Sequence, residues 1–172
     1  ETEGIAYIPE SRELDGLIGS FTIAENLILD VHDLAPVASR GQLNNEYINQ
    51  NSTKLVKEFD IRTQSIFDNV SALSGGNKQK VVLARELSRD VKLVVASQPT
   101  RGLDVGSIEF VYEKLLSERS ANRAILLISS ELDEVLELAD RIAVIYKGEI
   151  VGEVGPDVSR EKLGLMMAGI KQ

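Results

Sequence analysis

Residues 73–90, LSGGNKQKVVLARELSRD, decide how the chain folds, because two glycines stand directly before a helical pattern. Ser74 occupies the position of an N-cap hydroxyl. Gly75 and Gly76 carry no Cβ, so a large anion can approach the N–H groups of the first turn, where a helix is partly positive. The charged residues expected on the solvated side of this helix are Lys80, Arg85, Glu86 and Arg89. The stretch predicts a phosphate-facing helix start, although SGG alone is also common in ordinary turns.

The composition is typical of one soluble globular domain. The chain has 172 residues, of which 43% are hydrophobic and 27% charged, and its net charge is −8. The negative charge and the lack of long basic runs argue against autonomous nucleic-acid binding and against an electrostatic membrane anchor. No apolar run approaches the roughly 20 residues that a membrane-spanning helix needs.

Cysteine and histidine are too rare for several kinds of site. The chain has no cysteine, which excludes disulfides and thiolate metal sites. Its one histidine, His32, lies in a polar connection and is expected on the surface. We therefore predict no metal site built from this chain's own residues.

Short apolar runs alternate with helical patterns along the chain, which predicts an α/β fold. The runs at 92–96, 124–129 and 142–146 are unbroken, so we expect parallel strands buried on both faces. A fourth strand is expected at 5–8, before a polar loop at 10–16. Helices are expected at 21–30, with Thr22 and Glu25 forming a capping box, and at 45–59, 76–89, 108–117 and 131–139. Lys147 and Gly148 should turn the chain into a hairpin at 149–154, and Ser159 should cap a last helix.

Four stretches occur in one order: IAYIPESR at 5–12, LSGGNKQK at 73–80, LVVASQPTRGLD at 93–104 and LLISSELDEVLELADRIAVIYKGEI at 126–150. In this order, over about residues 4–170, the chain resembles the nucleotide-binding subunits of ABC transporters. The most specific matches are LSGG at 73–76, the signature loop, and PTRGLD at 99–104, the PTRGLD turn. SGGNKQK, PTRGLDVGS and LISSELDEVLELADRI look like the second nucleotide-binding half of sugar importers. The small residue and Gln before PTRG look more like the branch that imports purine nucleosides or related simple sugars.

The family's P-loop, GxxxxGK followed by Ser or Thr, has no counterpart in this sequence. We therefore expect the C-terminal part of a nucleotide-binding domain, with a truncated P-loop NTPase sheet that lacks the P-loop strand. The implied division is a helical subdomain at 22–90 that carries the signature loop, and a core α/β part at 1–10 and 91–172. In the family the P-loop strand lies between the strands that match 124–129 and 142–146. We expect these two to pair directly, or to be completed by another copy.

The family's catalytic positions are degenerate in this sequence. Ser97 stands in place of the metal-linked Asp, Gln98 in place of the catalytic Glu and Ser130 in place of the switch His. Glu10 stands at the Q-loop position. Mg²⁺ prefers carboxylate and water oxygens, and a Gln cannot take a proton from the attacking water. General-base assistance is worth about 10²–10⁴-fold, so we predict that no catalytic set is intact in this half.

The resemblance implies the ATP-binding component of an importer for simple sugars or nucleosides, in which this half lends its signature loop to ATP held by another half. The implied nucleotide-binding residues are Ser74, Gly75, Gly76, Asn77 and Gln79. The implied D-loop and interface residues are Arg101, Gly102 and Asp104. ATP with Mg²⁺ is implied for the intact complex, which would be an ATPase. The chain alone is expected to bind neither tightly and to be inactive.

The implied partners are another nucleotide-binding half on the same polypeptide, transmembrane permease subunits and, indirectly, a substrate-binding lipoprotein. The implied location is the cytoplasmic face of the membrane, with self-association of this chain as a further expectation. The alternative function is a non-transport ABC-type regulatory or scaffold domain that dimerises without driving transport. An exposed groove in 22–72 that receives a permease helix would distinguish the two.

Overall fold

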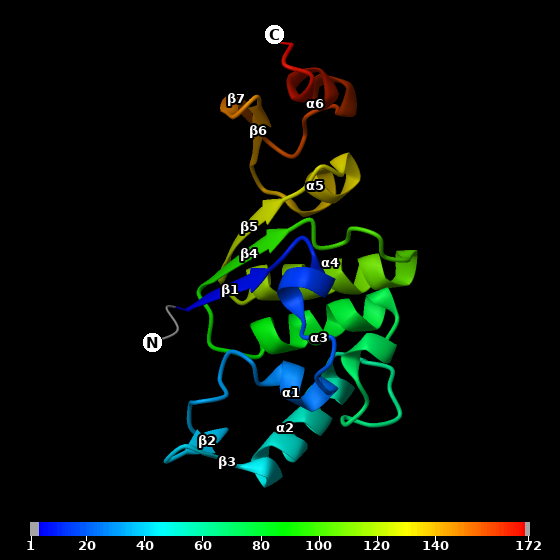
Figure 1. Ribbon diagram of the computed structural model, residues 1–172. Coiled ribbons are helices and arrows are strands. Elements are labelled where there is room, and N and C mark those ends of the chain that lie inside the picture. Colours follow the sequence, from blue (N-terminus) through cyan, green and yellow to red (C-terminus); the bar gives the residue numbers. More distant parts are fainter. Residues whose placement is uncertain (1–3, 171–172) are drawn as a thin grey trace. The chain divides into compact units, whose positions relative to one another are not determined.

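The computed structural model describes residues 4–170, which divide into two compact units after Leu126. The first unit holds the sheet and most of the helices, and the second holds a hairpin and two helices (Figure 1). The sequence-based division into 22–90 and the flanking core stays a prediction.

The sheet of the first unit has the strand order β1-β4-β5. β1 (Ile5–Ile8) pairs parallel with β4 (Leu93–Ser97), with Ile5 opposite Leu93 and Ile8 opposite Ala96. β5 (Ala124–Ile128) lies beside β4. The predicted strands are therefore present, and the parallel pairing expected from unbroken apolar runs is confirmed for β1 and β4.

Only one face of this sheet is buried among the described residues. Ala6, Ile8 and Val94 are buried, and α3 (Gly75–Leu87) packs against β1. Ile5 and Tyr7 point the other way along β1 and are 44% and 52% exposed. Successive side chains of a strand point to opposite faces, so helices on one face cannot cover the other. The expectation that the strands are buried on both faces is wrong for this part of the chain.

α3 is the central helix of the first unit. It lies between the sheet on one side and α1 (Ile23–Leu27) and α2 (Asn45–Glu58) on the other (Figure 1). It also contacts α4 (Val105–Ser120). The valines at 81 and 82 and the two residues after them are fully buried, as expected for a helix with neighbours on several sides.

Two charged residues of α3 are buried, although we expected them on its solvated side. Arg85 is 7% and Glu86 4% exposed. The Glu86 carboxylate pairs with Arg85 at 3.0 Å and with Arg89 at 2.6 Å, and Asp30 lies 3.2 Å from Arg85. Glu86 also accepts a hydrogen bond from the backbone N–H of Tyr7 at 3.1 Å. Helical spacing cannot reveal partners that arrive from β1 and from the segment after α1.

The segments before and after α1 differ in part from the sequence-based expectation. The predicted capping box is confirmed: Thr22 accepts from the Glu25 N–H, and Glu25 accepts from the Thr22 N–H. The helix is shorter than the predicted 21–30. The expected polar loop at 10–16 contains a single π-helical turn, η1 (Arg12–Gly16), with Ser11 as its cap.

Short elements complete the helical region. A small hairpin, β2 (Ala38–Ser39) and β3 (Gln42–Leu43), occupies the expected loop before α2, and a short 3₁₀ turn, η2 (Val70–Ala72), precedes α3. A buried cluster of Ala24, Ile28, Val37 and Ile48 holds α1, the hairpin and α2 together. His32 is exposed, as predicted.

The second unit is built on an antiparallel hairpin of β6 (Ile142–Tyr146) and β7 (Glu149–Val154). Lys147 and Gly148 both have positive φ, as a tight hairpin turn requires. α5 (Leu132–Leu138) and α6 (Arg160–Met167) pack on the hairpin core, and Ser159 caps α6 as predicted. β6 belongs to this separate sheet, so its expected direct pairing with β5 is not found in the described residues.

No helix among the described residues is long and apolar enough to cross a bilayer.

Candidate functional site

The signature loop ends in the predicted helix start. Ser74 has extended backbone angles, and its hydroxyl accepts a hydrogen bond from the Asn77 N–H at 3.4 Å. Gly75 is the first residue of α3, and Ser74 is exposed. The Asn77 side chain is bonded on both sides, donating to the Ser74 hydroxyl at 3.0 Å and accepting from the Arg62 N–H at 2.8 Å. Local hydrogen bonds therefore order the first turn of α3.

The two glycines allow neighbouring segments to approach α3 closely. A Cβ on Gly76 would lie 2.0 Å from the Ser107 hydroxyl oxygen and 3.3 Å from Asp104 Oδ2. A Cβ on Gly75 would lie 3.0 Å from Nη2 of Arg12. Gly76 is therefore required for the close packing of α4 against α3, a role that the sequence did not reveal, whereas a side chain at Gly75 would displace only the end of Arg12.

The PTRGLD turn lies beside the signature loop and leads into α4. Gln98 and Gly102 both have positive φ, so the chain bends sharply on each side of Thr100. Asp104 caps α4: its Oδ1 accepts from the Ser107 N–H at 3.0 Å and its Oδ2 from the Ser107 hydroxyl at 2.7 Å. These hydrogen bonds hold the pKa of the Asp104 carboxyl below its ordinary value.

Gln79 links the signature helix to the PTRGLD turn from inside. Its side chain is 2% exposed, and its amide donates to the Pro99 carbonyl at 2.9 Å. A buried amide that is already bonded is better placed to orient the turn than to reach a ligand. Direct nucleotide contact of Gln79 stays a prediction.

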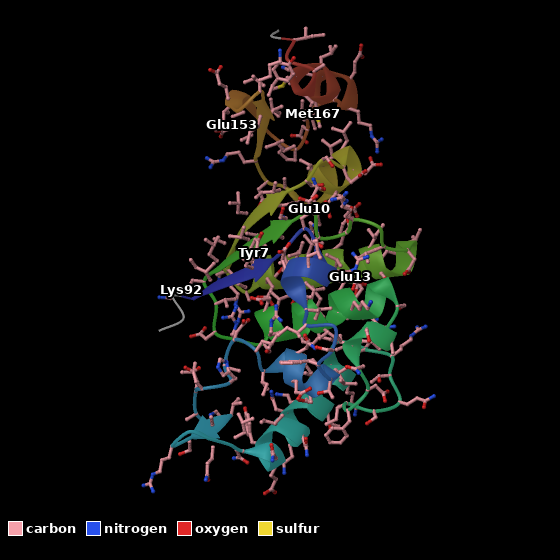
Figure 2. The ribbon with its side chains drawn as sticks, in the orientation of Figure 1. Tyr7, Glu10, Glu13, Lys92, Glu153 and Met167 are labelled. Carbon is pink, nitrogen blue, oxygen red and sulfur yellow. The ribbon has the colours of Figure 1, made fainter. Side chains whose placement is uncertain are left out.

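Charged residues that follow β1 contact both motifs (Figure 2 labels Glu10 and Glu13). Glu10, the Q-loop position, forms an ion pair with Arg101 of the PTRGLD turn. Glu13 pairs with Lys78 in the first turns of α3 at 2.9 Å. Arg12 donates through Nη1 to the Arg101 carbonyl at 2.9 Å. The structure therefore brings Glu10, the signature loop, Arg101, Gly102 and Asp104 into one region. Arg12 and Ser107 close two of the quoted stretches, IAYIPESR and PTRGLDVGS, but neither was predicted as a site residue because its partners lie in other segments.

The three positions that we predicted to be degenerate catalytic positions are divided between the two units. Ser97 is the half-buried last residue of β4, and Gln98 follows in a left-handed conformation. Ser130 is exposed and belongs to the second unit. Within residues 4–170, no group of three or more acidic, His or Cys side chains is arranged to hold a metal ion.

Curated proteins similar to this chain are ATP-binding proteins of importers. The guanosine import ATP-binding protein NupO of Bacillus subtilis is 44% identical over 170 residues, which are 98% of this chain and 33% of that protein. The nucleoside import ATP-binding protein NupA of Lactococcus lactis is 43% identical over 97% of this chain and 33% of its own length. The ribose import ATP-binding protein RbsA 2 of Rubrobacter xylanophilus is 37% identical, with similar coverage. The chain thus spans about a third of the relatives it matches. No protein-family model matches it.

Solved structures with a similar fold are ATP-binding cassettes. A dimeric cassette, MJ0796, bound to ADP and Pi has a TM-score of 0.71 and 22% identity, with 90% of this chain and 64% of that chain covered. An ATP-binding subunit of an ABC transporter has a TM-score of 0.72 and 21% identity over 96% of this chain and 68% of its own. At these identities the likeness establishes the fold alone.

Proposed function

Because this chain has the sequence and the fold of part of an ABC-type nucleotide-binding domain, we propose that it serves as the ATP-binding component of an importer. Nucleosides or simple sugars are the substrate classes, since similar proteins are named for guanosine, nucleoside and ribose import. The two at 43–44% identity are both named for nucleosides, which favours that class.

The observation that carries this proposal is the open start of α3. Ser74 is exposed, and the first two N–H groups of α3 belong to Gly75 and Gly76, which carry no side chains. Such a helix end binds phosphate through its free N–H donors and its partial positive charge. Ser74, Gly75, Gly76 and Asn77 would contact the phosphates of ATP held by the P-loop of another half. That half would be the direct partner of this one.

This half would itself be a poor catalyst. Ser97 offers a hydroxyl where Mg²⁺ favours a carboxylate, and Gln98 can orient a water but not deprotonate it. ATP and Mg²⁺ would bind in the intact complex through ligands of both halves. The permease, the binding lipoprotein and the cytoplasmic face of the membrane follow from the importer role and belong to the same proposal.

Hydrolysis measured in the assembled importer tests the asymmetry. Ser74→Ala removes the exposed N-cap hydroxyl of the signature loop, and we expect ATP turnover to fall by about tenfold or more. Removing a single preorganised donor to a developing anion has a cost of this order. Gln98→Ala should change turnover by less than about twofold, because no proton transfer through Gln98 is expected.

The two variants serve as controls for each other, since each replaces one polar side chain of the first unit with alanine. Equal loss from both, or no loss from Ser74→Ala, would contradict the proposal.

A further inference from the structure

The π-helical turn η1 is fixed lengthwise along α3. Its last residue, Gly16, accepts a hydrogen bond from Nη1 of Arg85 at 2.9 Å, and a Cβ there would lie 3.1 Å from Val82 Cγ2. In the middle of η1, Glu13 pairs with Lys78 at 2.9 Å. The end of η1 therefore lies beside the last turns of α3, and the beginning of η1 lies beside its first turns. Arg12, the first residue of η1, lies at the start of α3.

Arg12 contacts both functional segments at once. Nη1 donates to the Arg101 carbonyl at 2.9 Å, inside the PTRGLD turn. Nη2 lies 3.0 Å from the Cβ position of Gly75 and 3.9 Å from that of Gly102. One planar guanidinium group therefore spans the gap between the signature loop and the PTRGLD turn.

The placement of Arg12 is unfavourable in two respects. Its cation lies near the positive end of α3, where a negative group would be stabilised instead. Its Nε is buried and has no hydrogen-bond partner among the described residues. A buried N–H without a partner costs free energy, so the position is not explained by stability alone. The position is explained if the guanidinium holds the signature loop and the PTRGLD turn in place relative to each other.

We propose that Arg12 is a positioning residue that fixes the signature loop relative to the PTRGLD turn. Without the Arg12 guanidinium, the signature loop and the PTRGLD turn could move independently. The N–H donors at the start of α3 would then no longer keep a fixed position relative to the PTRGLD turn. The inference rests on the proposed function in one respect, because both segments are assigned there to a shared ATP site. The linkage itself is a property of this chain and can be measured without nucleotide.

Hydrogen exchange of this chain tests the linkage. In Arg12→Ala we expect the amides of residues 74–78 and 100–103 to exchange about three- to tenfold faster, as loss of one ordinary hydrogen bond allows. Glu13→Gln is the matched control on the same turn. It removes an exposed ion pair with Lys78 and should leave the PTRGLD turn unchanged. Thermal unfolding of each variant separates local loosening from loss of the fold.

Arg12→Lys separates geometry from charge. Lysine keeps the cation but has a single nitrogen, which cannot donate to the Arg101 carbonyl and also lie against Gly75. We expect Arg12→Lys to loosen both segments almost as much as Arg12→Ala. Full protection in Arg12→Lys, or loosening confined to residues 74–78 in Arg12→Ala, would overturn the proposal.

Turnover of the assembled importer tests whether the linkage matters for hydrolysis. Arg12→Ala should lower ATP turnover in the same direction as Ser74→Ala, and Glu13→Gln should not. If Ser74→Ala lowers turnover and Arg12→Ala does not, this inference fails and the proposed function stands. If neither lowers it, the proposed function fails, and the exchange data alone decide whether Arg12 fixes the two segments.

Discussion

At the scale of single residues, spacing in the sequence predicted the helix caps well. The Thr22–Glu25 capping box and the caps at Ser74 and Ser159 follow from local rules, and all are present. Contacts between residues far apart in the sequence, and additional roles of predicted site residues, were not predicted. Asp104 was predicted as an interface residue, and the structure also makes it the cap of α4. Arg12 had no role in the sequence analysis, because its contacts lie far along the chain.

The cap at Asp104 predicts a dependence of stability on pH. Two hydrogen bonds from Ser107 lower the pKa of the folded carboxyl below its ordinary value of about 3.9. The contribution of this group to stability is therefore fully present above about pH 4 and is lost as the pH falls through the folded pKa. Asp104→Asn keeps a capping oxygen but does not titrate. The advantage of wild type over Asp104→Asn in thermal unfolding should shrink between pH 6 and pH 2.

A constant difference between the two proteins across this range would show that the carboxylate charge does not contribute. Glu109→Gln, an exposed change within the same helix, serves as the control for general charge effects.

At the scale of elements, long periodic or apolar stretches were predicted reliably and short ones were not. α2, α3 and the strands were found within a few residues of their observed ends. η1 and the β2–β3 hairpin were missed, because a five-residue turn and two-residue strands are too short to show a period. The burial of Arg85 and Glu86 was also missed, since it depends on how α3 lies against β1.

The contact between α3 and β1 predicts a large loss of stability in Glu86→Ala. Burial raises the pKa of the Glu86 carboxyl, and the neighbouring Asp30 raises it further. The hydrogen bond from the Tyr7 N–H and the positive charge of Arg85 act in the opposite direction and favour the carboxylate. Removing it leaves Arg85 and Arg89 partly uncompensated and the Tyr7 N–H without its acceptor. We expect a loss of about 3 kcal/mol in urea unfolding.

The control for this change is Glu13→Ala, which removes an exposed ion pair and should cost at most ~1 kcal/mol. Similar small losses in both variants would contradict the view that the Glu86 network holds β1 against α3.

At the scale of the whole molecule, the order of motifs in the sequence predicted the α/β cassette fold and the parallel pairing. It did not predict that one sheet face is open, because an apolar run does not reveal what covers it. Nor did it predict that β6 lies in a hairpin sheet separate from β5. Each of these depends on contacts between segments distant in the chain, which local patterns do not encode.

The sequence as a whole predicts that this chain alone does not bind nucleotide tightly. It contains no P-loop pattern, and the open start of α3 supplies only a few phosphate contacts. Calorimetry with Mg-ATP should give no binding heat at micromolar concentrations. A cassette with an intact P-loop, measured under the same conditions, is the positive control. Micromolar affinity of this chain would contradict the proposal that the signature loop acts on nucleotide held by another half.

The hydrogen bonds between the backbone of β1 and side chains at the end of α3 and just after it also occupy one edge of the sheet. On the edge of β1 away from β4, the Tyr7 N–H is bonded to Glu86 and the Ile5 carbonyl to Arg89. An added strand would have to displace these charged side chains from their bonds to β1. The two side chains therefore protect this edge of the sheet against pairing with another strand.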